Sequence, residues 1–421
     1  MKKVYLIIIF SLCSIYDFAQ NTASPYSLIG IGDIEKSYFD KTSGLGYAGV
    51  ALISDKSVLL INPASLSFLQ NYSYYHNTFY IDVATRYRNV NYSGDAIKSS
   101  TNNQSNDVQF KKLTFTIKPK PKWGLSFGLL PYSTSNYSFT GVRRVQGSNE
   151  TITSAYDGNG STNLIYLSNS VLLSKKLSIG MQSSLLFGNF KDREIIYSAI
   201  TDSVLANEKS IFISKLMLKG GIIYKDTINK NWNYAIGATG SLKTNMSANS
   251  RIKITDGTTI LKSDEEKVDN YFTLPVMFTT GVAIHFKNTY SFVFDYTHQD
   301  WSSLNINGLN YSLKNSDRIG FGINYHYFPK QLTDKKKEHF FQLGFYNNNS
   351  YLNIYGEKIK EYAFTMGAGV QVSGNLTLQG ALEIGSKGTT NMGLIKENFT
   401  QFGLTVSYRD FWNSKKIKRY N

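Results

Sequence analysis

The stretch LSIGMQSSLLF, residues 177–187, alternates between apolar and small or polar side chains. Its apolar positions share one face, and they are Leu177, Ile179, Met181, Leu185 and Phe187. The opposite face carries Ser178, Gly180, Gln182 and Ser184. A period of two residues is that of a β-strand, because successive side chains of a strand point to opposite faces. The stretch therefore predicts a strand with one apolar and one small, polar face.

The same alternation returns in three later stretches, at 319–327, 362–372 and 402–408. In each one the second face is rich in Gly, Ser, Thr, Asn and Gln, whereas the outer face of a soluble sandwich is usually charged. Aromatic residues make up 14% of the chain and gather near strand ends, as in the aromatic girdles of membrane barrels. Segments of about ten residues with an apolar outside and a polar inside are typical of a transmembrane β-barrel.

Counting such segments gives fourteen candidate strands, which begin near residues 72, 108, 122, 161, 176, 210, 231, 268, 288, 313, 337, 359, 375 and 396. The connections after even-numbered strands are mostly short, at 119–122, 175–176, 287–288 and 374–375, and those after odd-numbered strands are longer, at 93–107, 145–160 and 248–267. Short periplasmic turns and long external loops alternate in bacterial barrels. The sequence thus predicts an all-β fold: a transmembrane antiparallel barrel of about 14 strands over residues 71–410, with both chain ends in the periplasm.

The N-terminus has the features of a secretory signal peptide. Lys2 and Lys3 precede the apolar run VYLIIIFSLC, which is too short to span a bilayer as a helix, and we place the cleavage after Ala19. The single cysteine, Cys13, is lost with the signal, so the mature chain has no disulfide and no thiolate metal site. Export and a barrel together predict the outer membrane of a Gram-negative cell. Residues 411–421 are expected to form a basic periplasmic tail.

The formal net charge is +15, which in other contexts indicates nucleic-acid binding. An exported chain does not meet nucleic acid, and the lysines are scattered through turns such as KPKPK and DKKKEH. We therefore expect no nucleic-acid partner and read the lysines as solvated turn residues that contact anionic head groups of outer-membrane lipids.

The stretch GLGYAG, residues 44–49, has the spacing of a dinucleotide-binding turn. The preceding YFDKTS is polar and does not form a buried strand, and the acid expected about 20 residues later is replaced by the run Asn62-Pro63-Ala64-Ser65. Glycine also permits positive φ and close backbone approach, which a segment packed inside a narrow lumen requires. The sequence favours this second reading, in which residues 20–70 plug the barrel as a hatch.

In this segment and in later ones the chain resembles a known family, the FadL-type outer-membrane transporters of long-chain fatty acids and other hydrophobic compounds. SGLGYAGVALISDKSVLLINPASL, residues 43–66, is similar to the family's hatch, in which a glycine-rich stretch with Gly44, Gly46 and Gly49 leads to an Asn62-Pro63-Ala64 motif. LSFGLLPYSTSNYSF, residues 125–139, resembles the third strand, whose kink, here at Pro131 and Tyr132, opens the barrel wall sideways.

Three further blocks carry the resemblance. Residues 273–286 and 292–304 match a Leu-Pro, Gly and Asp-Tyr…Trp-Ser pattern that includes Pro275, Asp295 and Trp301. The C-terminal residues 399–421 resemble versions of the family from Bacteroidetes. The resemblance implies a fourteen-stranded barrel plugged by its N-terminus.

Two prolines fall inside predicted strands, Pro131 and Pro275. A strand proline removes one hydrogen bond from the ladder, and in lipid no water replaces it. Pro131 is expected to mark a kink where the wall separates, the alternative being a simple bulge or strand end. For Pro275 a strand end or bulge without function is the favoured interpretation.

Catalytic and metal-binding patterns are weak. The five histidines are His76, His285, His298, His326 and His339, and no nucleophile, base and orienting acid converge in the sequence. Asp295 and His298 are three apart on one strand and point to opposite faces. The stretches YDGNGS, residues 156–161, and TDGTT, residues 255–259, each contain an aspartate followed by glycine, and they fit turns better than calcium-binding loops. We expect no enzyme activity, no catalytic residue, no metal and no cofactor.

Two functions remain for this chain. The first is passive uptake of hydrophobic, fatty-acid-like small molecules by hatch movement and lateral opening at the strand-3 kink. The alternative is a protein-binding role, such as the shuttle subunit of type IX secretion, which also has a FadL-like barrel. A simple porin fits the plug-like N-terminus poorly. The external loops at 93–107 and 251–267 are polar, which favours transport over cargo binding.

Overall fold

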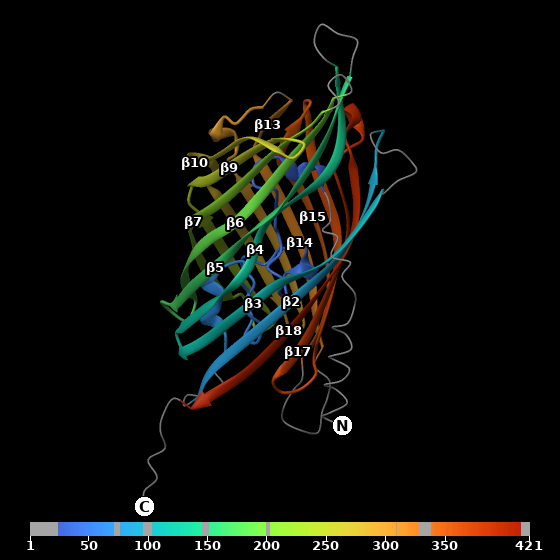
Figure 1. Cartoon of the computed structure of the whole chain (residues 1–421). Coiled ribbons are helices and arrows are strands. Elements are labelled where there is room, and N and C mark those ends of the chain that lie inside the picture. Colours follow the sequence, from blue (N-terminus) through green and yellow to red (C-terminus); the bar gives the residue numbers. More distant parts are fainter. Residues whose placement is uncertain are drawn as a thin grey trace, which may run out of the picture.

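The computed structural model is a closed antiparallel β-barrel with fourteen wall-spanning strands (Figure 1). It describes residues 24–70, 76–95, 103–144, 151–198, 203–308, 310–327 and 338–413. The expected signal peptide and most of the expected basic tail lie outside these residues. Within them, no helix is long and apolar enough to cross a membrane.

The strands follow one another around the wall, each antiparallel to the next, and the last pairs with the first along its whole length, from Lys396↔Ser93 to Asn413↔His76. The strands are β1 (Asp33–Ile34), β2 (His76–Ser93), β3 (Gln104–Lys120), β4 (Trp123–Arg144), β5 (Thr151–Leu172), β6 (Leu177–Ser198), β7 (Ser203–Thr227), β8 (Trp232–Ser241), β9 (Thr244–Asp256), β10 (Thr259–Leu274), β11 (Met277–Phe286), β12 (Tyr290–Gln299), β13 (Tyr311–Leu313), β14 (Ser316–Tyr327), β15 (His339–Ile354), β16 (Glu357–Gln371), β17 (Leu376–Lys387) and β18 (Lys396–Asn413). Two wall strands are interrupted, as β8–β9 and β10–β11, while β1 and β13 are short additions.

Five short 3-10 helices complete the structure: η1 (Pro25–Leu28), η2 (Ser43–Leu45), η3 (Pro63–Phe68), η4 (Ser302–Leu304) and η5 (Asn391–Gly393). The first three belong to the N-terminal segment, which we define as residues 24–70.

The predicted barrel of about 14 strands is confirmed, and the short predicted turns lie between strands as expected. The long loops predicted at 145–160 and 248–267 are wrong in part. Residues 151–160 belong to β5, and 248–267 are almost entirely the hairpin of β9 and β10. These strands continue beyond the alternating belt, where side chains on both faces meet solvent and the period of two in hydrophobicity is lost.

The two faces of the wall are those that the alternation predicts. The apolar side chains of the alternating stretches are exposed on the outside, namely Ile179, Met181, Leu185, Ile319, Phe321, Tyr325, Tyr327, Tyr362, Phe364, Met366, Val370, Val372, Phe402, Leu404 and Tyr408. Their polar neighbours are buried, among them Ser178, Gln182, Ser184, Asn324, Thr365, Gln371 and Thr405. So broad an apolar outer surface fits lipid and not water.

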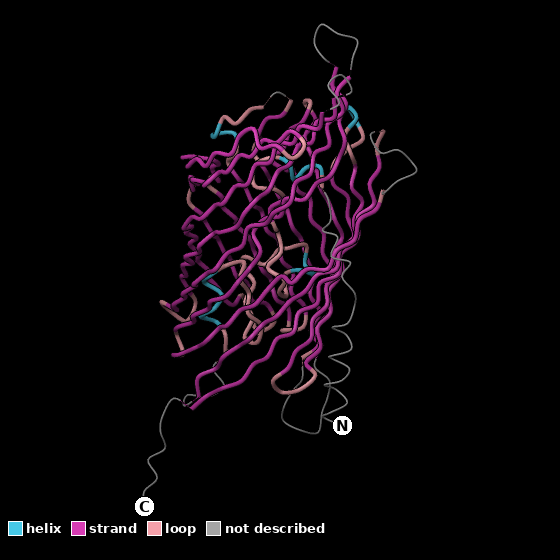
Figure 2. The backbone as a smooth tube through the Cα atoms, in the orientation of Figure 1, coloured by secondary structure: helices cyan, strands magenta, loops and turns pink. Residues whose placement is uncertain are grey.

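The N-terminal segment fills the lumen, where Figure 2 shows loops and short helices enclosed by strands. Glycines on the inner face of the wall let its backbone approach closely. A Cβ atom at these positions would lie 2.1–2.6 Å from an atom of residues 45–66, and the positions are Gly124, Gly180, Gly221, Gly237, Gly320, Gly322 and Gly344. They belong to β4, β6, β7, β8, β14 and β15, so the segment touches the wall on several sides.

The ladder is interrupted at two places, and the first lies between β3 and β4. These strands pair only from Lys120↔Trp123 up to Leu113↔Leu129. Beyond that point β3 stays with β2 and β4 stays with β5, so the wall splits (Figure 1). The freed edge of β4 is taken by β1, which pairs Asp33 with Thr134 and Ile34 with Ser133.

The second interruption lies beside β7. Its residues 219–227 pair with β8 and its residues 205–213 pair with β9, which leaves 214–218 outside both ladders. Opposite this gap the two interrupted strands break at Leu242–Lys243 and at Pro275–Val276. One weak backbone hydrogen bond, 3.4 Å from Leu242 N to Leu218 O, crosses the gap.

Candidate binding sites in the barrel lumen

Asn62 is the central anchor of the N-terminal segment. It is fully buried, and its Oδ1 accepts a hydrogen bond from Ala64 N at 3.0 Å, which caps η3 at Pro63. Its Nδ2 donates to Val50 O at 2.8 Å and to Ile222 O of β7 at 3.1 Å. One side chain therefore joins two parts of the segment to the wall.

The glycines of GLGYAG serve close packing. Gly46 has a φ of +63° and Gly49 a φ of +154°, both open to glycine without strain. The amide of Gly46 donates to Thr365 Oγ1 at 2.8 Å, and a Cβ on Gly44 would meet the backbone of Gly367 at 2.7 Å. The structure thus places all three glycines against the wall, with no phosphate-binding helix behind them.

Asp295 on β12 holds the next residues. Its Oδ2 accepts hydrogen bonds from Gly49 N at 2.7 Å and Val50 N at 2.9 Å, and the side chain is buried. His298, by contrast, pairs with Asp317 at 2.8 Å. The predicted position Asp295 therefore contacts the N-terminal segment, three residues from a histidine with other partners.

Pro131 and Tyr132 lie where β4 changes partners. The register with β5 shifts between Pro131↔Asn163 and Ser133↔Thr162, so Tyr132 is the extra residue of a bulge. The split between β3 and β4 begins two residues earlier, after Leu129. Tyr132 O accepts from Glu35 N at 2.8 Å, which continues the pairing of β1 with β4.

Tyr132 also faces an apolar cavity of about 80 Å³. Pro275 and Trp301, which the sequence singled out separately, line the same cavity, together with the apolar residues Ile34, Tyr38, Leu164, Met217, Leu218, Leu242, Leu274 and Met277 and the polar residues Gln182, Ser184, Lys219, Ser241 and Gln299. The ammonium of Lys219 is paired, since its Nζ donates to the Tyr38 hydroxyl at 2.9 Å and to Ile61 O at 2.6 Å. The indole of Trp301 stacks on Tyr351 at 4.3 Å between ring centroids and donates to Gln299 Oε1 at 2.6 Å. Leu242 lines the cavity although it is 64% exposed, so the wall is thin at the second interruption.

A larger pocket of about 460 Å³ opens on the side of the long connections. Its lining is mixed: the apolar side is formed by Leu28, Ile29, Phe190, Tyr271, Phe272, Leu304, Ile306 and Tyr311, and the polar side includes Ser135, Asp192, Lys243, Asn270, Thr273 and Ser303. The rings of Phe272 and Trp301 lie 5.8 Å apart, and both belong to one apolar cluster that also includes Leu164 and Tyr351. This cluster joins the outer pocket to the cavity.

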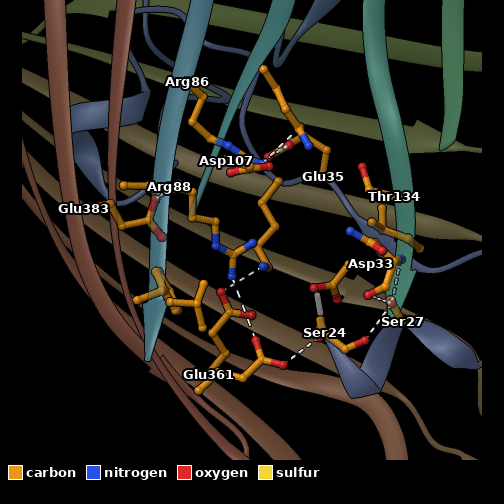
Figure 3. A pocket seen from close by; sticks show the side chains of 18 of the residues that line it. Ser24, Ser27, Asp33, Glu35, Arg86, Arg88, Asp107, Thr134, Glu361 and Glu383 are labelled. Carbon is orange, nitrogen blue, oxygen red and sulfur yellow. Dashed lines mark hydrogen bonds and ion pairs between the residues drawn. The ribbon is translucent and has the colours of Figure 1, made fainter. Parts of the chain in front are cut away.

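A charged cluster occupies the other side of β1, where the wall is split (Figure 3). Three residues of the N-terminal segment form ion pairs with different strands. Asp33 pairs with Lys387 at 2.5 Å, Lys36 with Glu361 at 2.8 Å, and Glu35 with Lys111 at 3.2 Å and Arg86 at 3.4 Å. These contacts close the split from inside, on the edge that β1 does not pair.

The carboxylates of Asp33, in β1, and of Glu35, directly after β1, are held in the ionised form. Burial alone would raise the pKa of Asp33, but Lys387 and Lys36 outweigh it and lower the pKa to about 2. Burial likewise opposes the charge of Glu35, and Lys111 and Arg86 lower its pKa to about 2.

The seal at the split should therefore withstand mild acid. The ordinary pKa values are 3.8 for Asp33 and 4.5 for Glu35, so the stabilising contribution is complete above about pH 4.5 and is lost as the pH falls towards 2. In planar bilayers we expect unchanged conductance at pH 5 and a rise between pH 4 and 2. A variant carrying Asp33→Asn and Glu35→Gln should lack this step, and an equal step in the variant would assign it to other groups.

Among the described residues, no group of three or more His, Cys, Asp or Glu side chains is arranged to hold a metal ion. Other histidines have structural partners among the described residues: His285 meets Ser291 Oγ at 2.8 Å and His326 meets Glu338 at 2.8 Å. His339 stacks on Tyr327.

Sequence reasoning singled out residues of the cavity and of the N-terminal anchors, but not the charged cluster. Asp33, Glu35 and Lys36 lie in the short mixed stretch IGDIEKSYF, residues 31–39, and their partners follow up to 354 residues later. The one available signal was inward-facing charge on predicted strands, such as Lys387 between Ser386 and Gly388.

The family model described as BamG matches residues 1–421. Among proteins of curated function, none matches this sequence.

Solved structures with the same architecture include the P. putida toluene transporter TodX, at 13% identity over 89% of this chain and 98% of TodX, with a TM-score of 0.57. The monoaromatic hydrocarbon channel CymD matches at 13% identity over 88% and 97%, with a TM-score of 0.57. A Pseudomonas aeruginosa FadL homologue matches at 13% identity over 89% and 98%, also with a TM-score of 0.57. The likeness to FadL-type barrels is confirmed for the fold, and a Bacteroidetes-type version stays a prediction.

Proposed function

We propose that this chain, which belongs to the BamG family, is an outer-membrane channel for the passive uptake of apolar small molecules. The observation that carries the proposal is the apolar cluster that joins the outer pocket to the inner cavity. The structural relatives include a toluene transporter and a hydrocarbon channel, which supports transport over the protein-binding alternative.

The route begins in the outer pocket. An apolar solute that leaves water there gains about 25 cal/mol per Å² of buried surface, so about 100 Å² is worth ~2.5 kcal/mol. Phe272 and Trp301 lie between the pocket and the cavity beside Tyr132. Uptake along this gradient needs no fixed catalytic group and no energy input.

The exit is lateral, since a step into lipid keeps the solute out of water. The kink at Pro131 was the exit expected from the sequence, and Tyr132 does line the cavity. The split beyond the kink, however, contains Asp33, Glu35 and their partners, where an apolar solute gains nothing. We therefore place the exit at the second interruption, between Leu218 and Leu242, which line the cavity directly.

In this proposal the N-terminal segment acts as a hatch. Ile34 and Tyr38 belong to it and line the cavity, so a small shift of the segment enlarges the space available to a ligand. Asn62 and Asp295 anchor the part further along the chain. Residues 24–38 are held by the pairing of β1 and by the ion pairs of Asp33, Glu35 and Lys36, so a shift of this part requires these ion pairs to break.

The proposal is tested by uptake of a fluorescent apolar probe into proteoliposomes that contain the purified protein. Tyr132→Lys adds a second ammonium to the cavity, without the hydrogen-bond partners that Lys219 has, and should lower the uptake rate at least tenfold, because an unpaired charge excludes apolar solutes. Tyr197→Lys, at an exposed position on β6, is the matched control and should keep the wild-type rate. Equal rates for empty and protein-containing liposomes would contradict the proposal.

A further inference from the structure

We propose that the charged cluster in the split between β3 and β4 binds the head group of a lipid that carries both a primary ammonium and a phosphate. This site adjoins the apolar cavity at Ile34, and it does not rest on the proposed transport. Its occupant enters from the bilayer through the split, with the head group inside and the acyl chains outside.

The site lies between the N-terminal segment and the inner faces of β2, β3 and β18 (Figure 3). Arg86 and Arg88 reach into it from β2, Asp107 from β3 and Glu397 from β18, while Thr134 of β4 lies on the opposite side. The lining is predominantly polar, unlike that of the cavity beside Tyr132. A pocket of this kind selects a charged or strongly polar ligand.

Several buried charged atoms in this pocket lack a hydrogen bond. Both carboxylate oxygens of Asp107 have none, although the residue is only 2% exposed. Arg86 is satisfied in part: its Nη1 meets Glu35 at 3.4 Å and its Nη2 donates to Gln109 Oε1 at 3.1 Å, whereas Nη2 stays 3.5 Å from Asp107 Oδ2 and Nε has no hydrogen bond. Buried charged atoms without a hydrogen bond are costly, so those of Asp107 indicate a site completed by another group.

On β18 and β2, Glu397 and Arg88 are likewise a buried carboxylate and guanidinium that lack hydrogen bonds at some of their atoms. Glu397 is 1% exposed, and its Oε1 accepts from Ser24 Oγ at 2.6 Å, whereas its Oε2 has no hydrogen bond. Arg88 approaches that Oε2 only to 4.0 Å, its Nε has no partner, and its guanidinium lies 4.9 Å from the centre of the Phe399 ring.

The buried atoms without a hydrogen bond belong both to cationic guanidinium groups and to anionic carboxylates. The ligand must therefore carry both a negative and a positive charge. A simple anion would meet Arg88 but would be repelled by Asp107 and Glu397. A simple cation would meet the carboxylates but would be repelled by Arg86 and Arg88. A zwitterion of the phosphoethanolamine type satisfies both sets, with its ammonium facing Asp107 and its phosphate facing Arg88.

The surroundings of the pocket point to a lipid as the source. Beyond Leu113 the edge of β3 no longer pairs with β4, so the ion pairs of Glu35 with Lys111 and Arg86, and no strand ladder, separate the pocket from the outside of the wall. On the outside of this edge stand Val108, 65% exposed, and Phe110, 54% exposed, with Phe139 exposed across the split on β4. An apolar rim around a charged pocket matches an amphiphile whose chains stay in the membrane.

The test compares lipid retention by the intact protein in nanodiscs, measured by native mass spectrometry after detergent exchange. With equal amounts of phosphatidylethanolamine, phosphatidylcholine and phosphatidylglycerol, we expect at least tenfold preferential retention of the ethanolamine lipid. The choline head group cannot donate hydrogen bonds to Asp107, and the glycerol head group carries no cation. Equal retention of the three lipids would overturn the proposal without the need for any variant.

Variants locate the site. Asp107→Asn together with Arg88→Gln should abolish the preference, while Lys176→Gln, at an exposed ion pair with Asp226 near the opposite end of the barrel, should retain it. Soluble phosphoethanolamine should compete only at concentrations at least a hundredfold higher, since it lacks the chains that rest on Val108 and Phe110. Retention that survives the double variant places the lipid elsewhere, and competition at equal concentration overturns the lipid as the source.

Discussion

Oxidation of a cysteine pair that replaces Leu218 and Leu242 should stop uptake of an apolar probe almost completely, and reduction should restore it. The two backbones are joined by one 3.4 Å hydrogen bond, so they lie as close as neighbouring strands and the pair is within reach of a disulfide. The bond would close the gap beside β7 through which we place the exit. Uptake by proteoliposomes, before and after reduction, measures the effect.

Two further pairs make this result specific. Ile222→Cys with Ala238→Cys joins β7 and β8 where they are already paired, and its oxidation should leave the uptake rate unchanged. Ile34→Cys with Ser133→Cys fixes β1 to β4 beside the kink. Inhibition by this last pair alone would return the exit to the kink at Pro131, and no inhibition by any pair would contradict lateral escape.

Asn62→Ala should convert a closed barrel into a conducting one. The substitution leaves the carbonyl of Val50 and the amide of Ala64 without their partner and releases the contact with β7. At about 1–3 kcal/mol for each buried group left unpaired, the closed state loses at least ~2 kcal/mol. A difference of 1.4 kcal/mol is tenfold in an equilibrium constant, so the open probability should rise more than tenfold.

Single-channel recording in planar bilayers measures that change. Adding Pro63→Ala, which removes the ring that fixes the start of η3, should increase the effect further. Asn91→Ala, at an exposed position of β2, is the matched control and should conduct like the unchanged protein. A closed Asn62→Ala channel would show that Asp295 and the ion pairs of the split hold the segment without this anchor.

The barrel could be predicted from the sequence because each of its rules is local. Alternation determines which face of the sheet a side chain such as Ile179 or Ser178 lies on. The short turns at 175–176 and 374–375 show which strand ends lie on the periplasmic side. Proline has a local effect as well, since Pro131 and Pro275 each lack a donor, and both lie where a ladder is irregular.

The rest depends on pairs that local rules do not reach. Pro275 lies at a strand end, directly after β10, which was one of the favoured interpretations, but only the register of β7 shows that its break and the one at Leu242 lie opposite one gap. The charged cluster was missed for the same reason, because Glu35 and Lys111 become neighbours only when β1 lies in the split. The predicted start of β5, near residue 161, is ten residues later than the observed one at Thr151. The alternation of apolar and polar residues is lost where a strand extends beyond the part that faces lipid.

The contacts of the N-terminal segment with the last strands also constrain the order in which the barrel folds. Ser24 is hydrogen-bonded to Glu397 and Asp33 is paired with Lys387, contacts that span 373 and 354 residues of chain. The first residues to leave the secretion machinery thus await strands that are among the last to emerge. Because β18 closes the ring on β2, and its neighbour β17 supplies Lys387, seating the N-terminus and sealing the cylinder belong to one late, high-contact-order event.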